Sequence, residues 1–524
     1  MLPMTVKEET SMFKIIDAGQ AAEMIKDGDC VCVNAFLALS NAEEVHKAIY
    51  ERFIKTGSPK NLTLVSQSGY GFWDENRLGE PYIRAGAAKK LIFGHYGCMP
   101  GTSRLVLQNE LEAYNLPMGA ISHAIRAQAA GLAGYISKVG LGIFVDPRVE
   151  GPGVNEISND NGMVRAVTID DDEYLYYKLP KFDIAIIKGT TVDPNGNISF
   201  ENECVTVDAL SVAQATKANN GKVIVQVDRV SHEFGRPWNV IVPGILVDAV
   251  VVCEPTAESK AALTMSGDIH VPFTHMQYWY KRVHAERGKT RSRNDCSADI
   301  IGRRAALELK RGDIVNIGIG IPEMVGKYAS ESGILNYITL TVESGGIGGL
   351  PASGSAFGAT IGADAIYHMS MQFDFYDGGG LDICFLGALE VDRFGNVNSH
   401  RGPDAFAGIG GFANIASAAK TVVFCLTFST KGLETVEKDG MVCINSEGSI
   451  PKFRKEIRSI SFSAQQAIKN GQRVLYVTER CVFRLTDIGL ELIEVAPGID
   501  IKRDILDRLP FDVSISQLSN QSNS

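Results

Sequence analysis

The sequence lacks an excess of positive charge and any long apolar run. Its 524 residues carry a formal net charge of −10, so nucleic acid is not expected as a partner. No apolar stretch reaches the roughly 18 residues of a membrane span, and even I-L-V-D-A-V-V-V-C contains Asp248. The first residues show no basic segment leading into an apolar one, as a secretory signal would. We therefore expect a cytoplasmic protein with no membrane partner.

Several catalytic signatures are also missing. The ten cysteines include no C-x-x-C pair and lie partly within apolar runs, which is typical of buried thiols in a reducing compartment. No P-loop, G-x-S-x-G turn or H-E-x-x-H pair occurs. The segments at 318–323 and 408–413 do not meet the G-x-G-x-x-G dinucleotide pattern. No metal cofactor is expected.

The chain does contain an internal repeat. F-D-I-A-I-I-K-G at 182–189 recurs as L-D-I-C-F-L-G-A at 381–388, and G-K-V-I-V-Q-V at 221–227 recurs as A-K-T-V-V-F-C at 419–425. The two pairs keep nearly the same offset along the chain. Because chance similarity rarely preserves spacing, we predict two tandem domains of common ancestry.

Both copies alternate short β-branched runs with helical patterns such as 42–53. This alternation is typical of parallel strands covered by helices on both faces, so both copies are predicted to be α/β domains. We place the first domain at 12–268 and the second at 297–514. The segment between them, 269–296, is rich in Lys and Arg. It is either a solvated linker or a basic collar beside an anionic cofactor.

The segment T-V-E-S-G-G-I-G-G at 341–349 places one acid, Glu343, between an apolar run and a glycine-rich loop. Glycines such as Gly345 and Gly346 let the backbone approach a ligand closely and expose N–H donors to an anion. We therefore consider both for substrate binding. Glu343 is a candidate nucleophile, and the alternative is a solvated acid before a turn.

The two copies differ at this acid. Laying 61–69 over 337–345 puts Gln67 opposite Glu343. A neutral amide cannot act as an anionic nucleophile, so we predict one active site per chain, in the second half. Carboxylates attack anomeric carbons, phosphoryl groups and thioesters. A retaining glycosidase needs a second acid about 5 Å away and aromatic platforms, but the chain has only three Trp. Acyl chemistry is favoured.

At this point the residues resemble a known family. V-E-S-G-G-I-G-G-L-P-A-S-G at 342–354 and Q-F-D-F-Y-D-G-G-G-L-D at 372–382 resemble family I CoA-transferases. The resemblance is to the acetate/propionate CoA-transferase branch with both halves fused, and the chain is also similar to succinyl-CoA:3-ketoacid CoA-transferase. Further matches lie at 94–97, 408–412 and 478–483, so the resemblance spans nearly the whole chain.

The resemblance implies two open α/β domains with the active site between them, and ping-pong exchange of CoA between an acyl-CoA and a free carboxylic acid. Glu343 would attack the thioester, and the CoA thiolate would turn the resulting anhydride into a glutamyl-CoA thioester. Coenzyme A is thus the expected co-substrate, with acids such as acetate or propionate as partners. The family also implies a homodimer or homotetramer.

Further roles follow only from the resemblance. Gly411, the second glycine of a G-x-G-G motif, would donate its N–H to the oxyanion of the tetrahedral intermediate. Gly378, Gly379 and Gly380 would pack against CoA or merely form a turn. The lysine pair at 89–90 is one candidate for the CoA phosphates, but the sequence does not single it out.

The chain departs from its relatives at several apolar positions. Met118 stands where relatives usually carry glutamine, Ile143 where a polar residue is common, and Phe36, Leu37 and Leu39 where a glycine-bearing turn is common. Replacing an amide by a thioether removes a hydrogen-bond donor. Either these changes are neutral in a short-chain transferase, or they contact an acid larger or more apolar than acetate, such as a medium-chain or aromatic one.

Two other functions stay open at this stage. In an acyl-CoA hydrolase, water rather than an acid would resolve the intermediate, and only an assay separates the two. A non-catalytic sensor of the same superfamily is the third possibility, because fold does not fix function. The intact V-E-S-G-G segment argues against a sensor.

Overall fold

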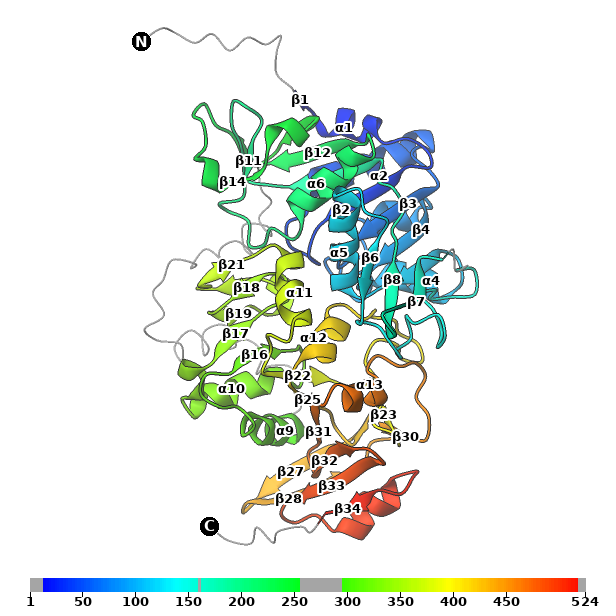
Figure 1. Cartoon of the computed structure of the whole chain (residues 1–524), viewed down its shortest axis with the longest axis vertical. Coiled ribbons are helices and arrows are strands. Elements are labelled where there is room, and N and C mark those ends of the chain that lie inside the picture. The colour runs from blue at the N-terminus through cyan, green and yellow to red at the C-terminus, as the bar shows by residue number, and fades with distance from the viewer. Residues whose placement is uncertain (1–12, 159–161, 255–294, 517–524) are drawn as a thin grey trace.

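The computed structural model describes residues 13–158, 162–254 and 295–516, which form two α/β halves, each built on a large sheet (Figure 1). Most of the predicted linker at 269–296 lies outside the described residues, so neither of its two interpretations is tested. In the described segments, no helix combines the length and the hydropathy that crossing a bilayer requires.

The first half centres on an eight-stranded sheet in the order β1-β15-β12-β9-β2-β3-β4-β5, with every neighbouring pair parallel. Its strands are β1 (Lys14–Ile16), β2 (Cys30–Asn34), β3 (Leu62–Ser66), β4 (Ala88–Phe93), β5 (Glu112–Asn115), β9 (Ile184–Lys188), β12 (Lys222–Val227) and β15 (Ala249–Val252). The central strands are nearly continuous apolar runs with both faces buried, as expected for a covered parallel sheet.

The second half centres on a ten-stranded sheet in the order β21-β18-β17-β16-β22-β25-β31-β32-β33-β34. Its strands are β16 (Ile314–Ile317), β17 (Thr339–Thr341), β18 (Gly346–Ile347), β21 (Ala365–Ile366), β22 (Ile383–Gly387), β25 (Thr421–Cys425), β31 (Arg473–Val477), β32 (Cys481–Thr486), β33 (Gly489–Val495) and β34 (Ser514–Ile515). The five strands from β17 to β31 are parallel, and antiparallel strands extend both edges.

The sequence repeat is also a structural repeat. The central order β15-β12-β9-β2-β3 of the first sheet recurs in the second as β31-β25-β22-β16-β17. The turn after each third repeat strand is also shared: Asp193 accepts hydrogen bonds from the N–H groups two and four residues later, at 2.8 and 2.9 Å, and Asp392 does the same at 2.9 Å. The prediction of two related α/β folds is confirmed, while the domain limits stay predictions.

Helices connect the strands. They are α1 (Ala18–Met24), α2 (Glu43–Thr56), α3 (Glu80–Arg84), α4 (Pro100–Leu107), α5 (Met118–Ala129), α6 (Ala209–Ala218), α9 (Ser297–Ala306), α10 (Glu323–Glu331), α11 (Met369–Asp377), α12 (Phe412–Ala418) and α13 (Ala464–Lys469). The helix predicted at 42–53 is α2, which carries Glu43 and Glu44 in its first turn and ends at Gly57 with φ 70°. Acids near the N-terminus and a left-handed glycine after the last turn are favourable helix ends.

Helices from both halves meet where the two sheets adjoin. Figure 1 shows α5 of the first half beside α11 and α12 of the second. The N–H of Gly119 donates to Oδ1 of Asn414 at 3.1 Å, and Nδ2 of Asn414 donates to Asp377 at 3.0 Å. Near the surface, Arg126 pairs with Asp374 at 2.6 Å. The halves are therefore joined by hydrogen bonds and an ion pair between α5 of the first half and α11 and α12 of the second.

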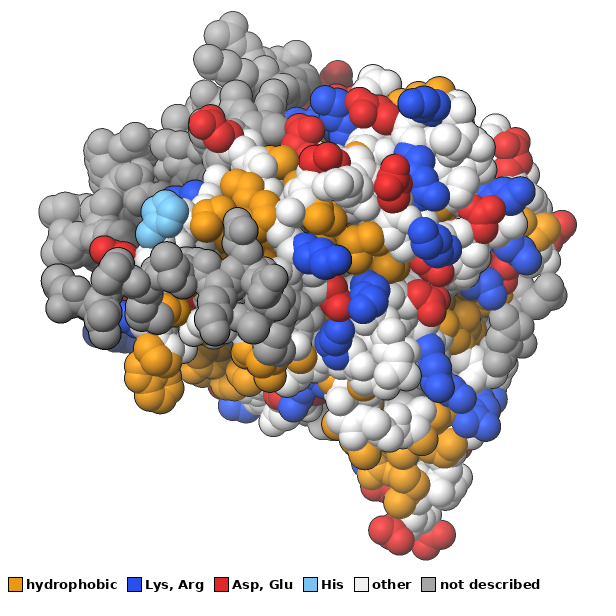
Figure 2. Space-filling view, turned by 90° about the horizontal axis from the view of Figure 1, so that it is seen from above, with side chains coloured by type: hydrophobic (Ala, Val, Ile, Leu, Met, Phe, Trp, Pro, Cys, Tyr) orange, Lys and Arg blue, Asp and Glu red, His pale blue; other side chains and the backbone are white. Residues whose placement is uncertain are grey.

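The outer surface of the first half is mixed in charge. On the face seen in Figure 2, Lys and Arg side chains are interspersed with Asp and Glu, and small hydrophobic areas lie between them. No field of one sign covers this face, in keeping with the net charge of the chain.

Candidate active site

Glu343 lies directly beyond β17, at the carboxyl edge of the second sheet. The loop that follows turns back tightly, because the N–H of Gly345 donates to the carbonyl of Val342 at 3.0 Å. Gly345 has φ 121°, and a Cβ on it would lie 2.1 Å from the carbonyl oxygen of Tyr367. A Cβ on Gly346 would lie 2.0 Å from Oγ1 of Thr360. The two glycines therefore let the loop pack against the chain behind it, which fixes Glu343 at the sheet edge.

The Glu343 carboxyl has two hydrogen-bond donors. Burial raises its pKa, and hydrogen bonds from its own backbone N–H and from the Asn316 side chain partly lower that pKa again. Asn316 projects from β16, the neighbouring parallel strand, and its Nδ2 also lies 3.3 Å from the carbonyl of Thr341. Within the described residues no Lys or Arg pairs with Glu343. Such a carboxylate is more basic, and hence more nucleophilic, than a solvated one.

Gly411 lies beside Glu343, immediately before α12. A Cβ on Gly411 would lie 3.1 Å from Cγ of Glu343, so no larger residue fits there without displacing the acid. The N–H of Gly410 donates to the carbonyl of Gly94 at 2.7 Å, whereas the N–H of Gly411 has no partner among residues 13–158, 162–254 and 295–516. The Gly411 N–H is therefore available to an oxyanion formed at Glu343.

The first half holds the segment that carries Gly411. The N–H of Met118 donates to the carbonyl of Gly410 at 2.9 Å. The side chain of Asn115 accepts from the N–H of Ile409 at 2.9 Å and donates to the carbonyl of Gly94 at 2.8 Å. Asn115 is fully buried. The position of the Gly411 donor is thus set across the boundary between the halves.

A cavity of about 1470 Å³ opens above Glu343 and is lined by both halves. The first half contributes Phe36, Leu37, Trp73, His95, Gly97 and Met118. The second half contributes, among others, Asn316, Gly318, Glu343, Phe357, Leu386, Gly411 and Lys452. This volume exceeds that of a typical small-ligand pocket, so the cavity has room for an extended co-substrate and a second small molecule together.

Of the predicted substrate contacts, Phe36 and Met118 line this cavity, whereas Leu39, Ile143, Gly345 and Gly346 are not part of its lining. Leu39 is buried behind Phe36: a Cβ on Gly358 would lie 2.4 Å from the Phe36 ring and 3.3 Å from Cδ1 of Leu39. Ile143 lines a separate cavity of about 70 Å³. The positions of Leu39 and Ile143 therefore do not support direct contact with the substrate acid.

The glycines Gly378, Gly379 and Gly380 lie at the opposite edge of the sheet from Glu343. They join α11 to β22 and so precede the strand, whereas Glu343 follows its strand. They are not part of the cavity lining, and a Cβ on Gly380 would lie 2.4 Å from the ring of Phe375. Their position supports the turn interpretation rather than contact with CoA in this cavity.

Sequence reasoning missed several polar residues of the cavity, among them Asn316, His95 and Lys452. Burial lowers the pKa of His95 to about 4, so its imidazole is neutral. Burial also lowers the pKa of Lys452 to about 8, and its Nζ donates to the carbonyl of Ala388 at 3.0 Å. Asn316 could have been identified from the repeat, which places Cys32 opposite it. This pair is a second position at which the two copies differ in polarity.

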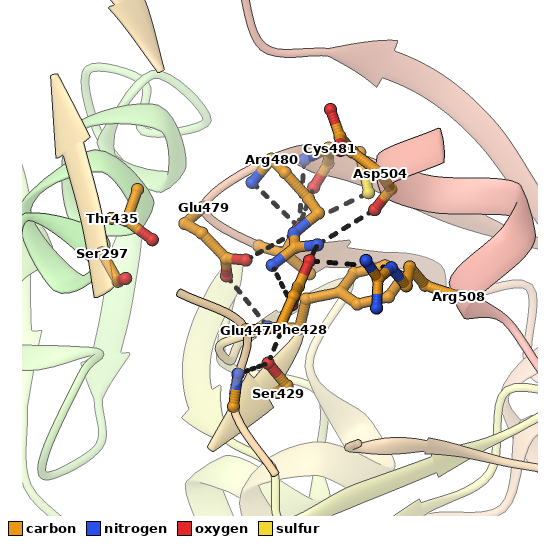
Figure 3. A network of polar contacts seen from close by, with 12 residues as sticks. Ser297, Phe428, Ser429, Thr435, Glu447, Glu479, Arg480, Cys481, Asp504 and Arg508 are labelled. Atoms are coloured by element: carbon orange, nitrogen blue, oxygen red, sulfur yellow. Dashed lines mark hydrogen bonds and ion pairs between the residues drawn. The ribbon is translucent and has the colours of Figure 1, made fainter. Parts of the chain in front are cut away.

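A buried ionic network surrounds Arg480 in the turn between β31 and β32 (Figure 3). The guanidinium of Arg480 is fully buried and contacts Glu479 at 2.7 Å, Glu447 at 2.8 Å and the carbonyl of Asp504 at 3.0 Å. Glu479 in turn accepts from the N–H of Phe428 at 2.9 Å. The network ties the turn between β31 and β32 to the C-terminal segment. Its members lie outside the cavity lining, which indicates a structural role.

Known proteins resemble the chain over both halves. The Coenzyme A transferase family model matches residues 15–253 and 299–502. Acetate CoA-transferase YdiF of Escherichia coli (strain K12) is 38% identical over 504 residues, which covers 96% of this chain and 93% of that protein. Caffeate CoA-transferase of Acetobacterium woodii is 39% identical over 517 residues, covering 96% and 95%.

A solved structure agrees with these relatives. The thioester complex with CoA of acyl-CoA transferase YdiF from E. coli O157:H7 has a TM-score of 0.85 to this chain and is 36% identical to it, covering 96% of this chain and 94% of that one. The matched ranges contain the strands that carry Asn316 and Glu343 and the segment that carries Gly411. The chain therefore belongs to the coenzyme A transferase family.

Proposed function

We propose that this protein is an acyl-CoA:carboxylate CoA-transferase in which Glu343 carries CoA as a thioester during each cycle. The observation that carries the proposal is Glu343 itself. It is a carboxyl with a raised pKa and no cationic partner among the described residues, it opens onto a large cavity, and it lies beside Gly411, whose N–H has no partner among those residues either.

The first half-reaction moves CoA onto the enzyme. An oxygen of the Glu343 carboxylate attacks the thioester carbonyl, the C–S bond breaks, and CoA leaves as a thiolate from a mixed anhydride. The thiolate attacks the glutamyl carbonyl, the anhydride C–O bond breaks, and the original acid leaves as a carboxylate. The Gly411 N–H donates to the oxyanion of each tetrahedral intermediate. Asn316 orients the carboxylate through the hydrogen bond that also lowers its pKa.

The second half-reaction is the same sequence in reverse with a different acid, so the kinetics are ping-pong. Holding CoA covalently keeps the free energy of the thioester from being lost to water. The relatives support this assignment: two are CoA-transferases by name, and a similar solved structure is described as a thioester complex with CoA. Assembly as a homodimer or homotetramer and a cytoplasmic location remain predictions.

Trapping the intermediate tests the proposal. Incubation with an acyl-CoA and no acceptor acid, followed by borohydride reduction and peptide mapping, should convert the Glu343 side chain to an alcohol. Glu343→Gln should fold and bind but lose transfer and show no conversion. An unmodified Glu343 in an actively transferring enzyme would overturn the mechanism. Free acid released without any acceptor, at the rate of transfer, would indicate a hydrolase instead.

A further inference from the structure

Two residues of the first half that line the cavity hold strained backbone conformations. Leu37 has φ 51° and Trp73 has φ 57°, in the left-handed region that side chains larger than glycine rarely adopt. Glycine would occupy either position without strain. The chain instead places a large apolar side chain at each, and both line the cavity. Strain of this kind is found at functional sites, and Leu37 and Trp73 differ from the equally strained Leu78 in that they line the cavity.

The Leu37 conformation is fixed by its surroundings. The N–H of Phe36 donates to the carbonyl of Leu39 at 3.1 Å and the N–H of Leu39 donates back at 2.8 Å. The N–H of Leu37 donates to Oγ of Ser68 at 3.0 Å. The turn therefore holds the Phe36 and Leu37 side chains at the end of β2, against the second half.

The residues of the first half that line the cavity form an apolar wall, which lies next to the carboxyl of Glu343. A Cβ on Gly410 would lie 3.9 Å from Met118 and 3.9 Å from His95. The next residue, Gly411, has its Cβ position 3.1 Å from Glu343. On the other side, the Phe36 ring packs against Phe357, with ring centroids 6.2 Å apart. The wall and Glu343 thus face the same part of the cavity.

The wall offers no counter-charge for a second carboxylate. Among the described residues, its only titratable side chain is His95, which burial keeps neutral. The cavity's two lysines come from the second half and are engaged: Lys327 pairs with Asp299 at 2.6 Å, and Lys452 donates to a backbone carbonyl. Besides Glu343, four acids line the cavity, namely Asp295, Asp299, Glu323 and Glu331. An additional anionic group placed against the first-half lining would therefore be desolvated with no cation of that half beside it.

We propose, resting on the function above, that the acid exchanged at Glu343 is a monocarboxylate with an apolar body longer than that of acetate, selected by Leu37, Phe36 and Met118. The apolar body lies against this wall when its carboxylate meets Glu343. Acetate leaves the wall uncovered, and a dicarboxylate buries a charge there. The wall thus discriminates by chain length and by charge at once.

Acceptor competition tests the proposal. With one acyl-CoA donor, kcat/KM is measured for acetate, hexanoate, 3-phenylpropionate and succinate. Hexanoate or phenylpropionate should exceed acetate by at least about tenfold, the discrimination that apolar pocket contacts give, and succinate should not exceed acetate. Equal use of all four acids, or a preference for acetate or succinate, overturns the proposal. If no glutamyl-CoA forms from the donor alone, the proposed function fails instead.

A glycine variant links the preference to the wall. Leu37→Gly relieves the strained backbone while removing the side chain, so it should fold, and the hexanoate-to-acetate ratio should fall about tenfold or more. Leu78→Gly is the matched control: Leu78 is also buried, has φ 55° and does not line the cavity. Its ratio should equal that of the wild type. An unchanged ratio in Leu37→Gly, or equal changes in both variants, contradicts the assignment.

An amide variant tests the third wall residue. Met118→Gln keeps the length of the side chain but adds a donor and an acceptor beside Gly410. The hexanoate-to-acetate ratio should fall by several-fold, while glutamyl-CoA still forms. Met441→Gln makes the same change on an exposed position of β28 (Met441–Ser446) and should leave the ratio unchanged. A ratio unaltered in Met118→Gln removes this residue from the proposal.

Discussion

At the scale of single residues, the site depends on how Asn316 tunes Glu343. Burial raises the pKa of Glu343, and the Asn316 side chain opposes that shift. Only the ionised carboxylate can attack a thioester. The fraction of competent enzyme therefore rises as the pH rises through the pKa of Glu343, and the Asn316 hydrogen bond is one of the groups that keep this pKa from rising further.

Removing the Asn316 amide should shift the acid limb of activity. Asn316→Leu takes away a hydrogen bond to the charged form, so the pKa of Glu343 rises further and the acid limb of the kcat/KM profile moves up by about one pH unit. Asn470→Leu, at an exposed position outside this cavity, is the control. A lower rate with an unshifted acid limb would mean that Asn316 acts only by orienting the carboxylate.

The residue scale also shows what the sequence could predict. Glu343 was identifiable because the repeat places an uncharged Gln67 opposite it. Met118 and Ile143 were equivalent in sequence, since both are apolar departures from the family pattern. Only the packing of the halves decides that Met118 lines the main cavity and Ile143 a separate one. Contacts across a domain boundary leave no periodic signal in either domain alone.

At the scale of elements, the segment before α12 is positioned by Asn115 at the end of β5. The Asn115 side chain makes three hydrogen bonds: it donates to the carbonyls of Phe93 and Gly94, both at 2.8 Å, and accepts from Ile409 at 2.9 Å. Gly411 follows two residues later. A shift of this segment would carry the oxyanion donor away from Glu343.

We expect Asn115→Leu to separate kcat from KM. The variant loses all three hydrogen bonds, so kcat should fall by up to about 10²-fold, approaching the effect of losing one oxyanion donor, with little change in the KM for acyl-CoA. Asn155→Leu is the matched control, because Asn155 also donates to two carbonyls, at 2.8 Å, and these belong to Val106 and Leu111 rather than to the segment that carries Gly411. Both variants should lose stability, and only the first should lose kcat. A wild-type kcat in Asn115→Leu would show that the segment before α12 keeps its position without Asn115.

Secondary-structure elements could be predicted from the sequence more fully than site contacts could. The strands, the two Asp turns and α2 follow from apolar runs, turn residues and helical periodicity, which are local properties. For Gly378–Gly380 the sequence left contact with CoA and a turn equally open; the segment precedes β22 and lies at the amino edge of the sheet, which favours the turn. Chain direction decides which edge a loop occupies, and a motif considered without its strand does not carry that information.

At the scale of the whole molecule, the two halves are joined by a buried polar group at the α5–α11–α12 contact. Burial raises the pKa of Asp377 to about 7, against a hydrogen bond from Asn414 that lowers it. Nε2 of His123 lies 3.7 Å away from the same carboxyl, and burial lowers the pKa of His123. Ionising Asp377 here is unfavourable relative to the unfolded chain.

The stability that Asp377 contributes at this contact between the halves therefore depends on pH. A carboxyl whose folded pKa lies above its unfolded value binds more protons when folded, so stability falls as pH rises from about 4 to 7. Asp377→Asn removes the ionisation and should raise the free energy of unfolding by roughly 1–2 kcal/mol at pH 8, with no gain at pH 4. Thermal unfolding across this pH range measures it. A variant less stable than the wild type at every pH would show that the ionised carboxyl is favoured in place.

The buried Gln67 has a consequence for stoichiometry. In the first half, the counterpart of the reactive acid is fully buried, with its Nε2 3.4 Å from Oδ2 of Asp208. Gln67 faces the carboxylate of Asp208 and does not line the cavity. A glutamate in its place would therefore have no room for a pantetheine arm, and it would lie beside a second negative charge. The two related halves are thus asymmetric: the first contributes to the lining of the cavity, and only the second carries the reactive acid. Exhaustive labelling should saturate at one CoA per polypeptide.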